Sequence, residues 1–147
     1  MTEHLDLNTN HATNSLPPGT LCRVRGSKSR YQDTVVLVLD TGIPPTEQLV
    51  RREPLGVLVA TFRGTAKLPL NELRPVTAVE RLGFIADPVT IKVPIMVEPH
   101  YGHWVGTLHA GFGKVSAIGD DAESAGEACL AVVRALIDAP AGVMITG

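Results

Sequence analysis

Residues 115–138 read VSAIGDDAESAGEACLAVVRALID, and this stretch says most about the fold. A short strand-like run passes through a glycine and two aspartates into a segment with apolar residues at three- and four-residue intervals. We expect a helix with Asp120 as its N-cap and Glu123 completing an aspartate version of the capping box. Pro140 and Gly142 end that helix. Its apolar stripe, which we expect to pack on a sheet, consists of Ala125, Ala128, Cys129, Val132, Leu136 and Ile137.

The residues before this helix predict the sheet on which it packs. Three runs of β-type composition occupy 89–98, 104–108 and 114–118, and glycine-containing turns separate them. Pro94 has no backbone N–H, so the first of these strands should lie at an edge, at least locally. Residues 143–145 can add a short final strand. The second half of the chain is therefore predicted to be a β-β-β-α(-β) unit.

The second half resembles a HicB-type antitoxin domain over residues 91–138. The motifs that carry this resemblance are VEP at 97–99, GHWV at 102–105, Gly111 and VSAIGDDAESA at 115–125. The resemblance implies a reduced ribonuclease-H-like sheet without catalytic carboxylates, which binds a small toxin ribonuclease and performs no chemistry itself. Members of the family often carry a DNA-binding segment after this domain. This chain instead has its additional module in front, a departure that leaves operator binding and toxin neutralisation open.

The first half consists of short strands with turn residues between them. Strand-like runs cover 20–25, 34–39 and 56–62, and the 34–39 run must be buried on both faces because it is apolar throughout. Arg63-Gly64 predicts a tight hairpin into 65–68, and LNELRPV at 70–76 closes the segment. In order and spacing, residues 19–76 resemble a Src-homology-3-like small β-barrel. No diagnostic motif accompanies this resemblance, and such barrels have many unrelated functions.

Composition changes along the chain suggest where the modules begin and end. We expect residues 1–18 to be a disordered leader, 19–76 a small β-barrel, 77–88 a linker and 89–147 a HicB-like domain of α+β class. Residues 16–80 hold nine Lys or Arg against six Asp or Glu, whereas residues 81–147 hold four against seven. This charge difference favours two separate folding units with different partners.

The composition of the 147-residue chain is that of a globular protein, with 44% hydrophobic and 19% charged residues. These fractions exclude an intrinsically disordered chain. The apolar runs are too short to span a bilayer, and the N-terminus lacks the basic start and apolar stretch of a secretory signal. Cys22 and Cys129 lie far apart without a CxxC motif, which favours reduced thiols. We expect a cytoplasmic protein without a membrane partner.

The side chains capable of chemistry form no catalytic pattern. His100, His103 and His109 are the only imidazole cluster in a segment predicted to be ordered, and the turn offers no further ligands for zinc. Helix capping accounts for Asp120 and Glu123. No set of residues supplies a nucleophile, a base and a stabilising group together. We therefore expect no enzyme activity, no metal and no cofactor.

Basic residues gather in the first half and could neutralise phosphates. Four cations occur within residues 23–30 with no acid between them, and two more flank the predicted hairpin at 63–64. A solvated face, a nucleic-acid site and a site for an acidic protein surface all remain open. Tyr31 is the one aromatic residue beside the patch that could stack on a base. The candidate nucleic-acid-binding residues are Arg23, Arg25, Lys28, Arg30, Arg63 and Lys67.

The function that these observations favour is that of a non-enzymatic binding protein. The HicB-like sheet would supply a protein-interaction surface, and a small sheet with one helix leaves an edge and a face that a second copy can cover. We therefore expect a homodimer, with a small toxin-like protein as another partner that the resemblance suggests. The alternative is a nucleic-acid-binding module that uses the basic β-barrel.

Overall fold

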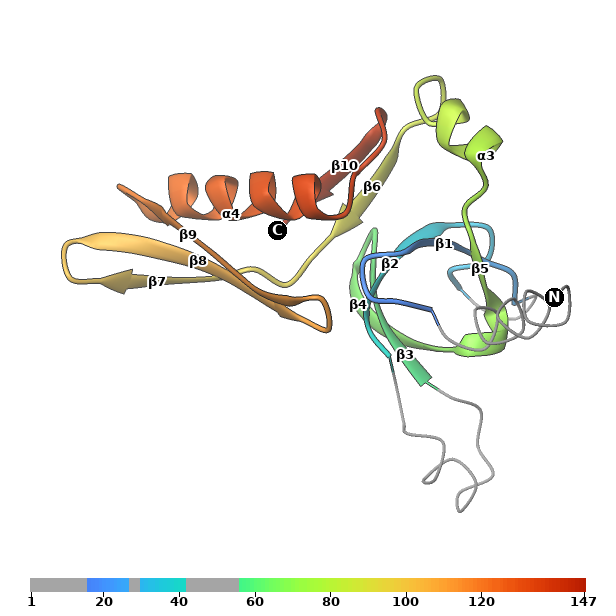
Figure 1. Ribbon diagram of the computed structural model, residues 1–147, viewed down its shortest axis with the longest axis horizontal. Helices are drawn as coiled ribbons and strands as arrows, with labels where there is room; N and C mark the ends of the chain where they lie inside the picture. The colour runs from blue at the N-terminus through green and yellow to red at the C-terminus, as the bar shows by residue number, and fades with distance from the viewer. Residues whose placement is uncertain (1–15, 27–29, 42–55) are drawn as a thin grey trace, which may run out of the picture.

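The computed structural model describes residues 16–26, 30–41 and 56–147, and their fold is of the α+β class (Figure 1). The first half forms an antiparallel sheet of five strands in the order β4-β3-β2-β1-β5. A 3-10 turn, η1 (Leu70–Glu72), precedes the last strand. The strands are β1 (Leu21–Val24), β2 (Val35–Asp40), β3 (Gly56–Thr61), β4 (Gly64–Pro69) and β5 (Leu73–Pro75).

The tight hairpin predicted at Arg63-Gly64 joins β3 to β4. Thr61 pairs with Gly64 in register, and its hydroxyl donates to the Gly64 carbonyl at 2.8 Å. Gly64 has a φ of 124°, a conformation that residues with a side chain rarely adopt. The sequence signal for this turn is thus confirmed by its geometry.

The packed part of the chain begins before the predicted start at Gly19. Leu16, which was assigned to the leader, is only 4% exposed and packs in the core of the first sheet. The Gly19 N–H donates to the Val38 carbonyl at 2.7 Å, which attaches this segment to β2. Residues 1–15 lie outside the described residues.

Residues 77–88, predicted to be a linker, contain a capped helix. α3 (Ala78–Gly83) begins after Thr77, whose hydroxyl accepts the Glu80 N–H while the Glu80 carboxylate accepts the Thr77 N–H. This reciprocal pair is a capping box. Phe84, which follows the helix, is buried in the core. The connection between the two halves is therefore itself packed.

The second half contains five strands and the long helix. β7-β8-β9 form an antiparallel sheet, and β10 pairs in parallel with β6. The strand predicted at 89–98 is divided into β6 and β7 around Pro94, which cannot donate a ladder hydrogen bond. The elements are β6 (Val89–Lys92), β7 (Met96–His100), β8 (His103–Ala110), β9 (Gly113–Gly119), α4 (Ala122–Leu136) and β10 (Val143–Thr146).

The cap of α4 lies one residue later than the sequence suggested. Asp121, not Asp120, is the N-cap, and Ser124, not Glu123, closes the capping box. The Asp121 carboxylate accepts the Ser124 N–H at 2.7 Å, and the Ser124 hydroxyl accepts the Asp121 N–H at 3.1 Å. Glu123 retains a favourable place in the first turn, where the helix dipole attracts negative charge.

The buried stripe of α4 also differs from the predicted one. Ala125, Cys129 and Val133 are buried at four-residue intervals. Val132 and Leu136, which were expected in the stripe, are 41% and 60% exposed. α4 nevertheless packs on β8 and β9 as predicted (Figure 1). None of the helices within the described residues is long and apolar enough to cross a membrane.

Gly106 of β8 allows α4 to approach the sheet closely. A Cβ atom at Gly106 would lie 2.6 Å from the carbonyl oxygen of Ala125, a distance that no side chain tolerates. Gly119, at the end of β9, lies equally close to the first turn of the helix. The glycines that permit this packing are therefore in the strands rather than in the helix.

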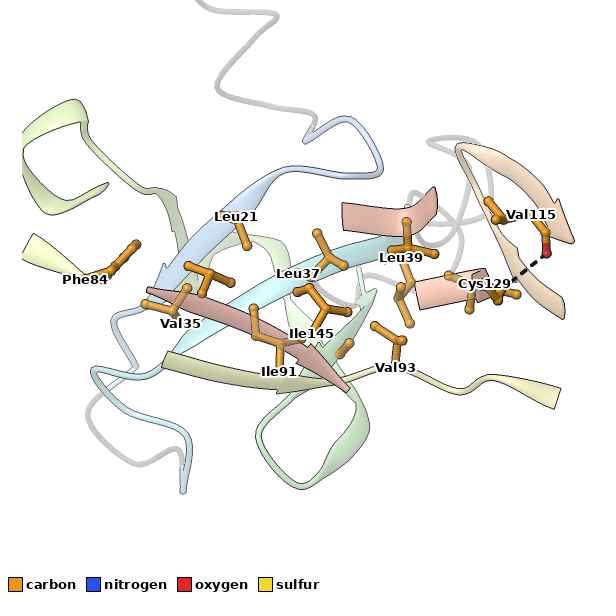
Figure 2. Packing of buried hydrophobic residues seen from close by; sticks show 14 residues of the cluster. Leu21, Val35, Leu37, Leu39, Phe84, Ile91, Val93, Val115, Cys129 and Ile145 are labelled. Atoms are coloured by element: carbon orange, nitrogen blue, oxygen red, sulfur yellow. Dashed lines mark hydrogen bonds between the residues drawn. The ribbon is translucent and has the colours of Figure 1, made fainter. Parts of the chain in front are cut away.

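β2 is buried on both faces because it separates two cores. Val36 and Val38 pack with β1, β3 and β4, whereas Val35, Leu37 and Leu39 face β6 and β10 (Figure 2). The smaller core consists of Leu16, Cys22, Val24, Val36, Val38, Val57, Val59, Leu68 and Leu73. The larger core consists of Leu21, Val35, Leu37, Leu39, Ala60, Phe84, Ile91, Val93, Leu108, Val115, Cys129, Val133, Val143 and Ile145.

The larger core is shared by residues on both sides of the predicted linker. Leu37 of β2 lies in it with Ile91 of β6 and Ile145 of β10 (Figure 2). Burial of such side chains stabilises each by about 1.5–3 kcal/mol relative to exposure. The separation of the chain into two folding units stays a prediction. A substitution in this shared core can test whether the two halves unfold together.

Candidate functional site

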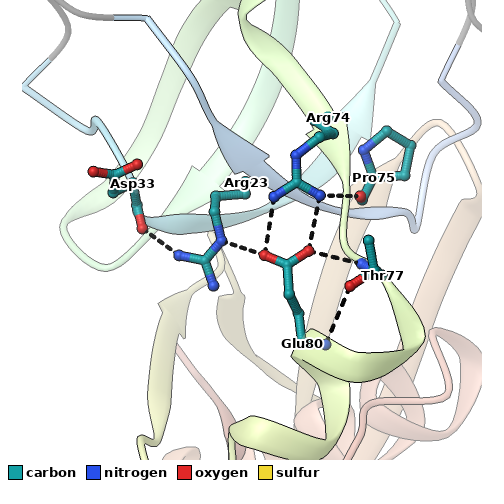
Figure 3. Close-up of polar contacts among 6 residues, drawn as sticks. All are labelled: Arg23, Asp33, Arg74, Pro75, Thr77 and Glu80. Carbon is teal, nitrogen blue, oxygen red and sulfur yellow. Dashed lines mark hydrogen bonds and ion pairs between the residues drawn. The ribbon is translucent and has the colours of Figure 1, made fainter.

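Three charged side chains meet where α3 packs against the first sheet (Figure 3). Arg23 of β1 and Arg74 of β5 are direct neighbours in the strand register. The Arg23 Nε donates to the Glu80 Oε2 at 2.6 Å. Arg74 donates from both terminal nitrogens, at 2.8 Å to Oε1 and 3.0 Å to Oε2 of Glu80. The carboxylate of Glu80 is therefore held by two guanidinium groups, one of them bidentate.

These contacts favour the charged forms of Glu80 and Arg74. The guanidinium of Arg74, the Thr77 N–H and the guanidinium of Arg23 hold the pKa of Glu80 far below its ordinary value. The hydrogen bond to Glu80 in turn raises the pKa of Arg74. Arg23 also donates from Nη1 to the Asp33 carbonyl oxygen. Two of the three guanidinium nitrogens of Arg23, Nε and Nη1, thus have partners within the fold.

A cleft of about 410 Å³ lies beside this cluster. The first sheet contributes one wall, the tip of the β3–β4 hairpin a second, and α3 with the segment leading into β6 a third. The lining residues are Arg23, Asp33, Thr34, Val35, Phe62, Glu80, Gly83, Phe84, Asp87, Pro88, Val89 and Thr90. The segment predicted as a linker therefore forms one wall of this cleft.

The other predicted cations lie apart from this cluster. Arg25, Arg30, Arg63 and Lys67 are exposed, and none makes an ion pair with another described residue. Lys28 lies outside the described residues.

Aromatic contacts show which of these cations are neighbours. Tyr31 and Phe62 meet edge to face, with ring centroids 6.0 Å apart, so the segments that carry Arg30 and Arg63 lie side by side. Arg25 belongs to a different segment, directly after β1. Its backbone N–H donates to the Glu72 carbonyl at 2.7 Å.

The sheet β7-β8-β9 has one face covered by α4 and an opposite face with exposed side chains (Figure 1). Met96 of β7 is 56% exposed and Ile118 of β9 is 66% exposed. The register places Ile118 directly beside Val105, and Glu98 on the other side of Val105. By the same register, this face carries Met96, Glu98, His100, His103, Val105, Thr107, His109, Lys114, Ser116 and Ile118.

The histidines and cysteines among the described residues are not arranged with other groups as a catalytic or metal site. His100 and His103 lie opposite each other in the β7–β8 register, with ring centroids 5.7 Å apart. Within residues 16–26, 30–41 and 56–147, no three His, Cys, Asp or Glu side chains are placed to hold a metal ion. Burial raises the pKa of Cys22 to about 12 and also raises that of Cys129. Both thiols are therefore protonated at neutral pH and poor nucleophiles.

Sequence reasoning missed the residues that organise the cleft. Arg74 lies in LNELRPV and carries no signal of its own. Glu80 had a usable signal, because Thr77-Ala78-Val79-Glu80 matches the capping-box pattern that precedes a helix. Its pairing with Arg23 depends on tertiary structure, since 57 residues separate the two.

Comparison of the chain with protein-family models, with curated proteins and with solved structures gives no match.

Proposed function

We propose that this chain is a non-enzymatic protein-interaction module that self-associates through the exposed face of β7-β8-β9. The observation that carries the proposal is the exposure of Met96 and Ile118 on a sheet that α4 covers from one side only. Exposed apolar side chains on such a face are stabilised when a second sheet covers them. Glu98 and Lys114 lie on the same face, so it carries both signs of charge, as a surface that pairs with its own copy requires.

The connectivity of the second half supports a HicB-like assignment. Three antiparallel strands lead into a helix, and the chain returns to pair in parallel with β6, which continues into β7. This arrangement agrees with the ribonuclease-H-like order that the resemblance implies. We take it as support for a binding role, and for a toxin-like protein as the partner to test after a second copy.

The connectivity of the first half supports a Src-homology-3-like assignment. The strand order β4-β3-β2-β1-β5 and the 3-10 turn before β5 agree with that architecture. Since such barrels serve many functions, this likeness adds no specific activity.

Nucleic-acid binding has less support than protein binding. Arg23, the first residue of the predicted patch, is engaged by Glu80 and the Asp33 carbonyl. Asp33 and Asp87 line the cleft beside Phe62, and their carboxylates would repel phosphates there. The remaining exposed cations leave the nucleic-acid alternative as a prediction for experiment.

The mass of the native chain in solution tests the proposed self-association. We expect a dimer mass by light scattering at tens of micromolar, roughly the range where a micromolar interface is occupied. Ile118→Glu should convert the dimer to a monomer because it replaces an exposed apolar side chain of the proposed interface with a charge. Val79→Glu, a change at an equally exposed apolar residue on α3, should leave the dimer intact. A native chain that is monomeric at this concentration would contradict the proposal.

A further inference from the structure

The cleft beside α3 has the size and shape of a small-ligand site. Its volume of about 410 Å³ falls within the range of about 300–1,000 Å³ that is typical of such sites. Val35, Phe62, Phe84 and Val89 supply apolar wall, and charged groups lie among them. Small-molecule sites commonly combine an apolar lining with a few polar groups in this way.

The charges around the cleft favour a cation. One arginine, Arg23, and three acidic residues, Asp33, Glu80 and Asp87, line it, which leaves a net charge of two negative. Glu80 is already paired with Arg23 and Arg74, whereas Asp33 and Asp87 make no ion pair with any residue in the described ranges. Two carboxylates therefore remain available to a positively charged ligand.

An exposed aromatic ring lies among these carboxylates. Phe62, at the tip of the β3–β4 hairpin, is 46% exposed and lines the cleft. Its edge-to-face contact with Tyr31 holds the ring in place at a centroid distance of 6.0 Å. The negative face of an aromatic ring attracts an organic cation, and guanidinium groups stack on it readily.

Two other ligand classes fit the cleft less well. An anion would meet Asp33 and Asp87, and the one arginine that lines the cleft already donates to Glu80 and to the Asp33 carbonyl. A metal ion would need a closer group of ligands, and the described part of the chain contains no such group.

We propose that this cleft binds a monovalent organic cation, a guanidinium or primary ammonium group, between Phe62 and the carboxylates of Asp33 and Asp87. The ligand is either a free small molecule or the arginine or lysine side chain of a partner. The inference is independent of self-association, because the cleft shares no residue with the exposed face of β7-β8-β9.

An NMR titration of the full chain with ethylguanidinium tests the proposal. We expect saturable shifts of the backbone amides of residues 33–34, 62, 87 and 89–90, with a dissociation constant of about 1 mM, as befits a single charged group. Ethylurea, which has nearly the same shape without the charge, should produce no saturable shifts. Saturable shifts of these amides with ethylurea or inorganic phosphate would overturn the proposal, as would none with ethylguanidinium.

Matched variants separate the cleft from general surface charge. Asp33→Asn/Asp87→Asn should weaken ethylguanidinium binding by about fivefold or more, since two exposed ion pairs are lost. Asparagine tolerates the positive φ of 64° at position 33, so the turn is retained. Glu123→Gln/Glu127→Gln removes the same number of charges from α4 and should leave the affinity unchanged. Equal affinities of both double variants would contradict the assignment.

Two further measurements identify the contact and the source of the cation. Phe62→Leu keeps an apolar side chain and should weaken binding by about two- to fivefold through loss of the ring face. An acetyl-Gly-Arg-Gly-amide peptide that binds more tightly than ethylguanidinium assigns the cation to a partner protein. Equal affinities assign it to a small molecule. In both cases the amide shifts must fall on residues that line the cleft. Shifts at other residues would contradict the proposal.

Discussion

The two sheets of this protein differ in how many of their faces the chain itself covers. β2 in the first sheet has apolar side chains on both faces and buries Val36 on one side and Leu37 on the other. β9 in the second sheet buries Val115 toward α4 and leaves Ile118 exposed on the opposite face. The chain itself covers both faces of β2, whereas it leaves exposed the face of β9 that carries Ile118.

This difference accounts for the positions of the candidate sites. In the first half, the larger core joins β2 to β6 and β10, and the cleft forms at the rim of that contact. In the second half, α4 reaches only one side of β7-β8-β9. We therefore propose a cationic ligand for the cleft, which the first sheet forms together with α3 and the segment after it, and a protein partner for the exposed face of β7-β8-β9.

The largest effect is expected from Leu37→Ala, which removes a buried side chain from the shared core. We expect a loss of about 2–5 kcal/mol in the free energy of unfolding, because the change leaves a cavity between the two halves. Trp104, the single tryptophan, lies in β8 of the second half and reports on that half alone. Its fluorescence transition in urea should shift as far as the transition followed by circular dichroism.

Separate folding units would give the opposite result. In that case Leu37→Ala would lower the stability of the first half and leave the Trp104 transition where it is in the native chain. Leu58→Ala, in the adjacent strand β3 but with a partly exposed side chain, is the control and should move neither transition appreciably. The measurement decides whether residues 77–88 separate two folding units or lie within a single cooperative unit.

Much of the fold follows from local patterns in the sequence. The apolar run 34–39 predicts a strand buried on both faces, and β2 confirms it. The strands of the second sheet, the hairpin at Gly64 and the helix stop before Pro140 were also predictable, because turn and cap chemistry acts over a few residues. The cap of α4 was misplaced by one residue, since Asp120 and Asp121 are both good N-cap residues and each is followed three residues later by a polar side chain, Glu123 or Ser124.

The candidate sites were less predictable for a physical reason. Arg23 looked like a free cation because its partner, Glu80, is distant in the sequence. The carboxylates of the cleft come from β-sheet loops and from the segment after α3, so no local motif contains them. Charge counted along the chain therefore indicated a basic patch, whereas folding pairs Arg23 with Glu80 and places Asp33 and Asp87 along the adjacent cleft.

A smaller effect is expected from Glu80→Gln, which tests the ion pairs of Glu80 with Arg23 and Arg74. Glutamine preserves the capping-box acceptor for Thr77 but removes the charge between Arg23 and Arg74. The pKa of Glu80 is lower in the folded chain than its ordinary value of about 4.3, so its stabilising contribution is fully present above that value. As the pH falls through and below the unfolded value, that contribution is lost.

Urea denaturation between pH 7 and pH 3 measures this contribution. The Glu80→Gln variant should be less stable than the native chain at pH 7, and the difference should narrow as the pH falls. Glu127→Gln, on the exposed side of α4, should follow the native curve at every pH. A constant difference between Glu80→Gln and the native chain would show that the ion pairs contribute nothing to stability.

The smallest effect is expected in nucleic-acid binding. Here the comparison is between two exposed cations of the first half, Arg30 and Arg63, and the paired cation Arg23. In a salt titration of DNA and RNA binding, each phosphate-contacting cation that is removed lowers the log–log slope by about one. Arg30→Ala/Arg63→Ala should therefore lower the slope of any binding by about two, because these exposed cations lie on adjoining segments at the Tyr31–Phe62 contact. Arg23→Ala should leave the slope unchanged, since the guanidinium is held by Glu80 and the Asp33 carbonyl. Equal log–log slopes for the native chain and both variants would mean that these arginines form a solvated face that contacts no phosphate. A slope that falls only in Arg23→Ala would mean that Arg23 leaves Glu80 and binds phosphate.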